Sequence, residues 1–177
     1  IADCIFTGLS TDTGCFRYAN VTPRTMHMAA EMIESGADHS KINIIMFETK
    51  TRTYVALERL ALESMEMYLD GKCAFITITH DMYRRSGSDE SEVDAIAAIP
   101  RQIEGVVVGV TMREKTDGTF KVSMRTHEGV DASAVCAMLG GGGHPRAAGC
   151  TVSGNVNTAR NLVVSCIEKY LQEDVNN

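Results

Sequence analysis

The sequence predicts an α/β fold, with a helical N-terminal segment and a linker helix followed by a mixed sheet flanked by helices. Two observations support this prediction. Apolar residues recur at helical spacing early in the chain, whereas β-branched runs begin only after Gly71. The later order of expected elements, β-α-β-β-α-β-α, is typical of a mixed sheet with helices packed against it.

The N-terminal part contains three expected helices. Residues 1–9 are apolar and fit either the end of a helix or a short strand. Thr22, followed by a proline, predicts a helix start, because Thr is a preferred N-cap and Pro is tolerated at the first helical position. Gly36 is placed to end that helix, and Asp38 is the expected cap of a short second one. A third helix is expected over about 51–69.

The remaining chain supplies the expected sheet. The predicted strands are CAFITITH (73–80), VVVGVTMRE (106–114), TFKVSMRT (119–126) and CTVSG (150–154). The turn KTDG predicts a hairpin between the second and third of these strands. Residues of 119–126 alternate between the two faces of the strand, with Phe120, Val122 and Met124 on one face and Lys121, Ser123 and Arg125 on the other.

Three further helices are expected among these strands. An acidic helix starts near 88–92 and is ended by Pro100. A second helix, capped by Asp131 or Ser133, leads into the glycine run, and a closing helix covers about 157–172.

The composition is that of an ordinary globular protein, with 44% hydrophobic and 23% charged residues. No apolar run approaches the roughly 20 residues that cross a bilayer, so no membrane partner is expected. The net charge of −6 argues against a broad basic face for long nucleic acid but permits a small phosphorylated ligand in a local pocket. The six widely spaced cysteines favour buried free thiols of a cytoplasmic protein over a zinc site, and their even number leaves one bridge open.

The stretch GGGGHPRAAG (140–149) is the strongest local signal. Consecutive glycines supply backbone N–H groups that can approach a bulky group closely. Exposed amides beside an arginine and a histidine suit an anion, most often phosphate. The alternative is a flexible linker, which the apolar segments at both ends of the run disfavour.

Arg125 and His144 are the candidate partners of that anion. Arg125 ends a strand on its polar face, and a guanidinium can hold two phosphate oxygens at once. His144 can donate to phosphate or stack on a base. The alternative for Arg125 is a solvated strand residue, and the alternative for His144 is a cap of the glycine turn. Among the other nearby basic residues, Arg146 is interpreted as a rim charge and His127 is left undecided. Lys121 and Arg113 are interpreted as plain surface residues.

A second candidate lies in GLSTDTGCFRY, where Asp12 sits among hydroxyl side chains. This is a suitable setting for one metal-ligating carboxylate, but a divalent metal needs several ligands. The alternative reading of Asp12 is a simple loop cap.

Both regions resemble the DHH phosphoesterase family. GLSTDTGCFRY with VTPRTMHMAAEMIESGAD is similar to the last motif of its catalytic domain. EGVVVGVTMREKTDGTFKVSMRT and VDASAVCAMLGGGGHPRAAG are similar to the DHH-associated domain, and the nearest type is the bifunctional oligoribonuclease and pAp phosphatase, a relative of the RecJ exonucleases. The resemblance implies a remnant of the catalytic domain at 1–50, a connecting helix at 51–71 and a substrate-binding domain at 72–177.

The resemblance also implies a manganese-dependent hydrolase of short oligoribonucleotides, linear or cyclic dinucleotides, or pAp. Asp12 matches the final metal-ligand aspartate of the family. The positions that match its substrate clamp are Arg125, Gly141, Gly142, Gly143 and His144. The D-H-H triplet and the earlier aspartate motifs are absent from these residues, so we expect the chain alone to bind substrate without hydrolysing it and to hold no Mn²⁺. The chain begins without Met and inside an apolar pattern, which indicates a piece of a longer polypeptide.

Other functions stay open at this level. A similar domain ends some alanyl-tRNA synthetases, so the main alternative is a nucleic-acid-binding module without catalysis, which the charge of −6 and the TDTG segment disfavour. A purely structural domain leaves the glycine run unexplained. The choice among the nucleotide substrates and the question of a homo-oligomer also stay open.

Overall fold

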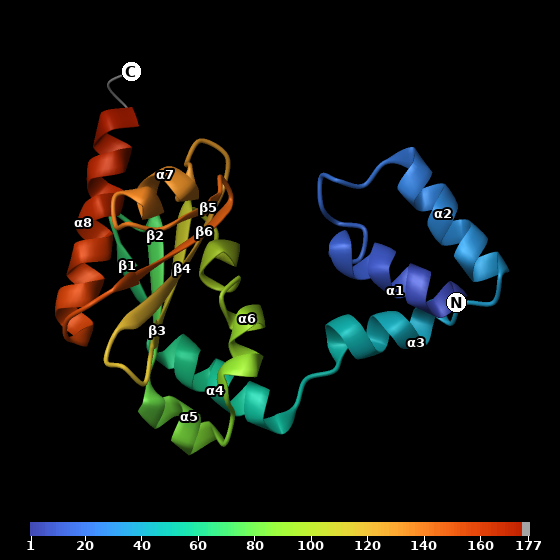
Figure 1. Ribbon diagram of the computed structural model, residues 1–177, viewed down its shortest axis with the longest axis horizontal. Coiled ribbons are helices and arrows are strands. Elements are labelled where there is room, and N and C mark those ends of the chain that lie inside the picture. The colour runs from blue at the N-terminus through green and yellow to red at the C-terminus, as the bar shows by residue number, and fades with distance from the viewer. Residues whose placement is uncertain (175–177) are drawn as a thin grey trace. The chain divides into compact units, whose positions relative to one another are not determined.

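The structure, a computed structural model, describes residues 1–174 (Figure 1). It consists of two compact units, Ile1–Thr51 and the chain from Arg52 onward. Regular elements of the first unit are all helical, whereas the second combines helices with one six-stranded sheet. The predicted α/β class with a mixed sheet is confirmed. The last residues of the region expected at 72–177 lie outside the described part of the chain.

The first unit packs its helices around a small core. Its elements are α1 (Ala2–Asp12), α2 (Pro23–Glu34), α3 (His39–Asn43) and the π-helical turn η1 (Ile44–Glu48). Phe6 of α1, Ala29 of α2 and Ala37 are buried together. Segment 1–9, for which the sequence allowed helix or strand, is part of α1. Thr22 caps α2 as predicted, in a reciprocal capping box with the third residue of the helix.

The second unit begins with a helix and then alternates strands and helices. Its elements are α4 (Arg52–Glu63), β1 (Glu66–Tyr68), β2 (Cys73–Ile78), α5 (His80–Ser86), η2 (Glu90–Glu92), α6 (Val93–Ile96), η3 (Pro100–Gln102), β3 (Val108–Glu114), β4 (Phe120–Thr126), α7 (Ala132–Ala137), β5 (Gly142–His144), β6 (Ala147–Val152) and α8 (Val156–Asp174). Both η2 and η3 are 3-10 turns.

The strands form one mixed sheet in the order β1-β2-β3-β4-β6-β5. Strands β2 and β3 run parallel, and each other neighbouring pair is antiparallel. A parallel pair needs a long crossover, which the segment from α5 to η3 provides. The predicted hairpin joins β3 to β4, and Lys115 N donates to Thr119 O across its turn at 2.8 Å.

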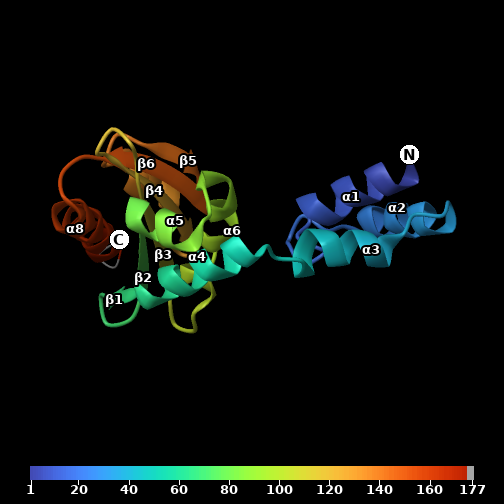
Figure 2. The same ribbon diagram turned by 90° about the horizontal axis from the view of Figure 1, so that it is seen from below.

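The two faces of the sheet are covered by different helices. Alternate residues of the central strands, such as Val110 and Val122, lie in the largest apolar cluster with Ile167 of α8 and with α7. On the opposite face, Ile76 of β2 packs with Leu57 of α4 in a second cluster that includes α5 and α6. Figures 1 and 2 show α8 on one side of the sheet and α4 to α6 on the other. On this second face, the part of the sheet formed by β4 and β6 carries polar and small residues.

The helix expected over 51–69 is shorter in the structure. It ends at Glu63, and the next residues form β1, which pairs with β2. Ser64 sits at the break, where its hydroxyl donates to Thr77 O of β2 at 2.9 Å. Pairing with an existing strand therefore replaces the last turn of a helix that local propensity favours. Through Leu57, α4 is part of the second unit's core rather than a bare connector.

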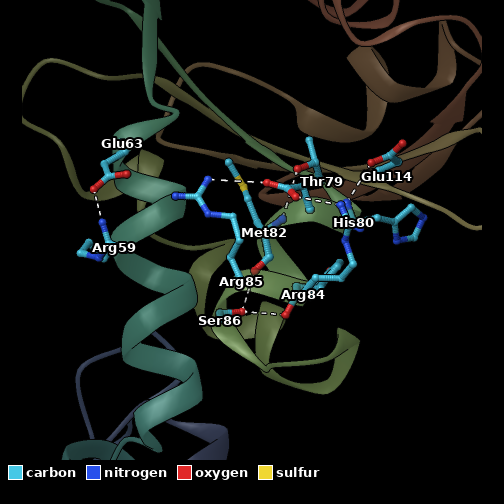
Figure 3. A network of polar contacts seen from close by, with 11 residues as sticks. Arg59, Glu63, Thr79, His80, Met82, Arg84, Arg85, Ser86 and Glu114 are labelled. Atoms are coloured by element: carbon cyan, nitrogen blue, oxygen red, sulfur yellow. Dashed lines mark hydrogen bonds and ion pairs between the residues drawn. The ribbon is translucent and has the colours of Figure 1, made fainter.

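Helix α5 was not expected from the sequence, and polar contacts hold it in place (Figure 3). At its start, the Thr79 hydroxyl accepts a hydrogen bond from Met82 N. His80 N donates to Glu114 Oε2 at 2.9 Å, which ties α5 to the end of β3. Near its end, the Ser86 hydroxyl donates to Met82 O at 2.8 Å. These bonds fix α5 at the carboxyl end of the parallel strand pair.

The cysteines are free, as predicted, and no disulfide joins them in the described chain. The expectation that they are all buried is wrong. Cys4 is exposed and two others are half-buried. The buried thiols are Cys73, Cys136 and Cys150.

Substitution of Gly109 by alanine tests how tightly η3 packs on β3. A Cβ atom at Gly109 would lie 2.4 Å from Arg101 N and 2.9 Å from Pro100 C, both of them backbone atoms. We expect Gly109→Ala to lower the free energy of unfolding by about 1–3 kcal/mol in urea titrations, because η3 must move. Gly142→Ala is the matched control, since its Cβ would meet nothing within 4 Å. Equal unfolding free energies for the two variants would contradict this packing.

Candidate functional site

The glycine run forms a hairpin at the edge of the sheet. After α7, the chain turns at Gly140 and enters the short strand β5, which pairs antiparallel with β6. Strand β5 was not predicted from the sequence. The strand after it was predicted to start at Cys150, whereas β6 begins three residues earlier, at Ala147. Glycine is rare in strands, so this strand exists because β6 offers it hydrogen bonds.

Different glycines of the run are needed for different reasons. A Cβ atom at Gly141 would lie 2.2 Å from Gly149 O, and one at Gly143 would lie 2.7 Å from Ala147 O. Gly143 also has a φ of +149°, which side chains rarely adopt. Gly142 has open space where its side chain would be. Two of the three candidate glycines therefore serve backbone packing, and only Gly142 presents its bare surface outward.

Strand register brings Arg125 and His144 to one face of the sheet. Arg125 of β4 is paired with Ala147 of β6, which is paired with His144 of β5. Directly opposed residues of antiparallel strands project to the same face. Met124 lies in the apolar cluster, so its neighbour Arg125 points to the opposite face of the sheet. With about 4.8 Å per strand, the two residues are about 10 Å apart, with a small alanine between them.

The adjacent rows extend this face. Ser123, Gly149 and Gly142 lie opposite one another in the next row, and Lys121 lies opposite Thr151 in the row after that. The result is a shallow surface of small residues with a cation at each end of β4. We call it the open face, made up of Arg125, Ser123, Lys121, Ala147, Gly149, Thr151, Gly142 and His144.

The cations of the open face are not neutralised by acids. Over residues 1–174, neither Arg125 nor Lys121 forms an ion pair with a carboxylate. Arg125 is half-buried, and its Nη1 donates to Met124 O at 3.0 Å, which restrains the guanidinium. By contrast, Arg113 lies within 3.7 Å of Glu90 Oε2. A restrained cation without an acidic partner is suited to an anionic ligand.

A cleft of about 450 Å³ lies beside the glycine run. Its lining consists of Lys121, Gly140, Gly141, Gly149, Cys150 and Thr151. Arg125 and His144 are not among these residues. Of the candidates from the sequence, Gly141 therefore lines the cleft, whereas Arg125 and His144 lie in a separate row of the sheet. The sequence interpreted Lys121 as plain surface, although the alternation of β4 already placed it on the same face as Arg125.

His127, the undecided position, and Arg146, which the sequence interpreted as a rim charge, both have structural contacts. His127 Nε2 lies 2.9 Å from Arg101 O of η3. Arg146 Nη1 donates to His127 O, and the buried Thr126 hydroxyl donates to Val130 O at 2.8 Å and Pro145 O at 3.1 Å. These bonds fasten the β5–β6 turn to the end of β4.

Asp12 lies in the first unit as the exposed last residue of α1. Its Oδ2 and its carbonyl oxygen each accept a hydrogen bond from Asn20 Nδ2, both at 3.2 Å. No group of three or more His, Cys, Asp or Glu side chains that could hold a metal gathers in the described residues. A lone carboxylate does not fit a divalent metal centre, because such ions need several ligands.

The turn that follows Asp12 is strained. Gly14, Cys15 and Phe16 have φ values of +57°, +58° and +60°, a left-handed conformation that non-glycine residues avoid. Thr13 Oγ1 accepts from Phe16 N at 3.0 Å, and Arg17 Nε donates to Gly14 O at 2.6 Å. Such strain persists only where the surroundings hold it, and it concentrates at functional segments.

Comparison with known proteins agrees with this architecture. Residues 71–169, within the second unit, match the model of the DHHA1 domain. The chain is 33% identical over 172 residues to the "Bifunctional oligoribonuclease and PAP phosphatase NrnA" of Thermus thermophilus, covering 97% of this chain and 51% of the relative. The Bacillus subtilis protein of the same name is 27% identical over 151 residues, covering 85% and 47%.

A solved structure extends the likeness to both units. The exopolyphosphatase-related protein of Bacteroides fragilis superimposes with a TM-score of 0.89 at 26% identity, covering 98% of this chain and 51% of that one. The chain thus spans about half the length of the relatives it matches.

No helix among the described residues combines the length and the apolar character that a membrane crossing requires.

The DHHA1 match covers more than half of the chain, and it includes β4, the glycine run and most of α8. The chain therefore belongs to the DHHA1 domain family, and its predicted place among the DHH-family phosphoesterases is confirmed.

Proposed function

We propose that this chain is the substrate-binding part of a phosphoesterase that hydrolyses short oligoribonucleotides, linear or cyclic dinucleotides, or pAp. The observation that carries the proposal is the open face, where Arg125 lies in one row with His144 and pairs with no carboxylate of the described residues. The printed names of the relatives, oligoribonuclease and PAP phosphatase, support the substrate class.

In this proposal Arg125 holds a phosphate group and His144 holds a second phosphate or stacks on a base. The guanidinium keeps further N–H groups for phosphate oxygens after its bond to Met124 O. His144 is exposed on the edge strand, so a base can lie against its ring. Ala147, which lies between them, and Gly149 and Gly142 in the next row are small and leave room for a flat nucleotide. A net charge of −6 makes a long nucleic acid an unsuitable partner for the same face.

The chemistry requires divalent metal, proposed to be Mn²⁺, which activates a water molecule for attack on phosphorus when bound. Asp12 would give one ligand to that metal. The described residues do not complete a centre around Asp12. The chain of 177 residues is therefore proposed to bind nucleotides without hydrolysing them.

Arg125→Ala tests the phosphate contact. We expect the dissociation constant for pAp, measured by calorimetry, to rise about 10- to 100-fold, the equivalent of about 1.5–3 kcal/mol for a charged hydrogen bond. Arg59→Ala is the control, because Arg59 is exposed and pairs with Glu63 in its own helix. An unchanged dissociation constant for Arg125→Ala, or an equal rise for Arg59→Ala, would rule out this contact.

Gly142→Val tests whether ligand lies against the glycine run. The added side chain projects onto the open face without striking protein atoms near its Cβ. We expect native-like unfolding together with pAp binding at least about tenfold weaker. If the variant folds and binds with wild-type affinity, the ligand does not lie against Gly142.

The metal proposal predicts the behaviour of the chain in an activity assay. With Mn²⁺ and a short oligoadenylate, we expect no release of mononucleotide by residues 1–177, because a single carboxylate cannot hold the ion. Asp12→Asn should leave nucleotide binding unchanged in calorimetry. Manganese-dependent turnover that the Asp12→Asn variant lacks would contradict the assignment of an incomplete centre.

A further inference from the structure

Two cysteine thiols lie directly beneath the glycine run. Cys136 of α7 and Cys150 of β6 belong to the same apolar cluster and are 0% and 7% exposed. Gly141 contacts both residues: its N–H donates to Cys136 O at 2.9 Å, and a Cβ at Gly141 would lie 2.5 Å from Cys150 Cβ. The turn that starts the β5 hairpin is thus built against this pair.

The two thiols differ in character. Interaction with the neighbouring Cys150 thiol raises the pKa of Cys136, and burial adds to this shift. The same interaction lowers the pKa of Cys150, although burial acts in the opposite direction. Cys150 is therefore the group that more readily becomes a thiolate, and Cys136 the one that keeps its proton.

Of the three buried cysteines, Cys150 is also the one that borders a cleft. It lines the cleft of about 450 Å³, with Lys121 at the rim. Cys73, in contrast, is fully buried, and burial raises its pKa to about 12. Cys166 is half-buried on α8; burial and the nearby Cys150 raise its pKa. Among the buried cysteines, Cys150 is therefore the one nearest to where a small oxidant could enter.

We propose that Cys150 and Cys136 form a reversible thiol–disulfide pair, with Cys150 as the thiol that a hydroperoxide oxidises and Cys136 as the thiol that resolves it. In the first step the Cys150 thiolate attacks one peroxide oxygen, which gives the sulfenic acid and releases an alcohol or water after protonation. In the second step the Cys136 sulfur attacks the Cys150 sulfur and displaces the hydroxyl group as water. The two thiols lose two electrons, which the peroxide takes up.

This bridge would tie the end of α7 to β6 across the whole glycine run. Because the Gly141 backbone lies against both residues, a bond between the two sulfur atoms would act on Gly141 and on the cleft that it lines. We expect nucleotide binding to weaken on oxidation, a consequence that rests on the proposed function. Formation of the bridge does not depend on it.

The test is oxidation of the reduced 177-residue chain by a slight excess of hydrogen peroxide in dilute solution. We expect the intact mass to fall by two hydrogen atoms, peptide mapping to link Cys136 with Cys150, and dithiothreitol to reverse both. Cys136→Ser should leave a sulfenic acid on Cys150 that dimedone labels, and Cys150→Ser should abolish the bridge. Cys166→Ser is the matched control and should still form it.

Other oxidation products would contradict the proposed pair. A bridge between Cys150 and Cys166, a bridge between chains, or loss of the product in Cys166→Ser would overturn the pairing. Calorimetry with pAp before and after oxidation tests the consequence, and we expect binding to be about tenfold weaker in the bridged form. Equal binding by both forms would overturn control by the bridge. If the reduced chain does not bind pAp at all, the proposed function fails while the mass data still decide the pairing.

Discussion

The close approach of the glycine run to β6 is the constraint on which the open face depends. At Gly141 and Gly143 there is no space for a Cβ atom, because backbone atoms of β6 occupy it. Only this approach lets β5 pair with β6 and brings His144 into the row of Arg125. The glycines therefore act first on the architecture of the sheet edge, and any contact with a ligand through their amides is an addition to that role.

Most of the fold could be predicted from local sequence because its signals are local. The alternation from Phe120 to Arg125 assigns each residue of β4 to a face, whatever the rest of the sheet does. Thr22 identifies the start of α2 because capping involves only the next few residues. The same alternation puts Arg125 and Lys121 on one face of β4. This is the part of the candidate site that could be predicted from the sequence.

The features that sequence reasoning missed depend on distant partners. Strands β1 and β5 have no β-rich composition and exist because β2 and β6 offer them hydrogen bonds. Helix α4 stops early because Ser64 and β1 engage β2 instead. The roles of His127 and Arg146 were equally hidden, since each binds a backbone carbonyl far away in sequence. Periodicity cannot show which strand will lie alongside a given segment.

The strained turn after Asp12 bears on how the first unit contributes. Cys15 and Phe16 hold left-handed conformations that cost of order 1–3 kcal/mol each, a large sum for a unit whose core is built around Phe6 and two alanines. Side-chain hydrogen bonds of Thr13 and Arg17 hold this turn in place. A turn maintained at that cost keeps the end of α1 in one position. Because the turn begins directly after Asp12, it fixes the backbone at this residue, whose carboxylate accepts a hydrogen bond from Asn20 across the loop.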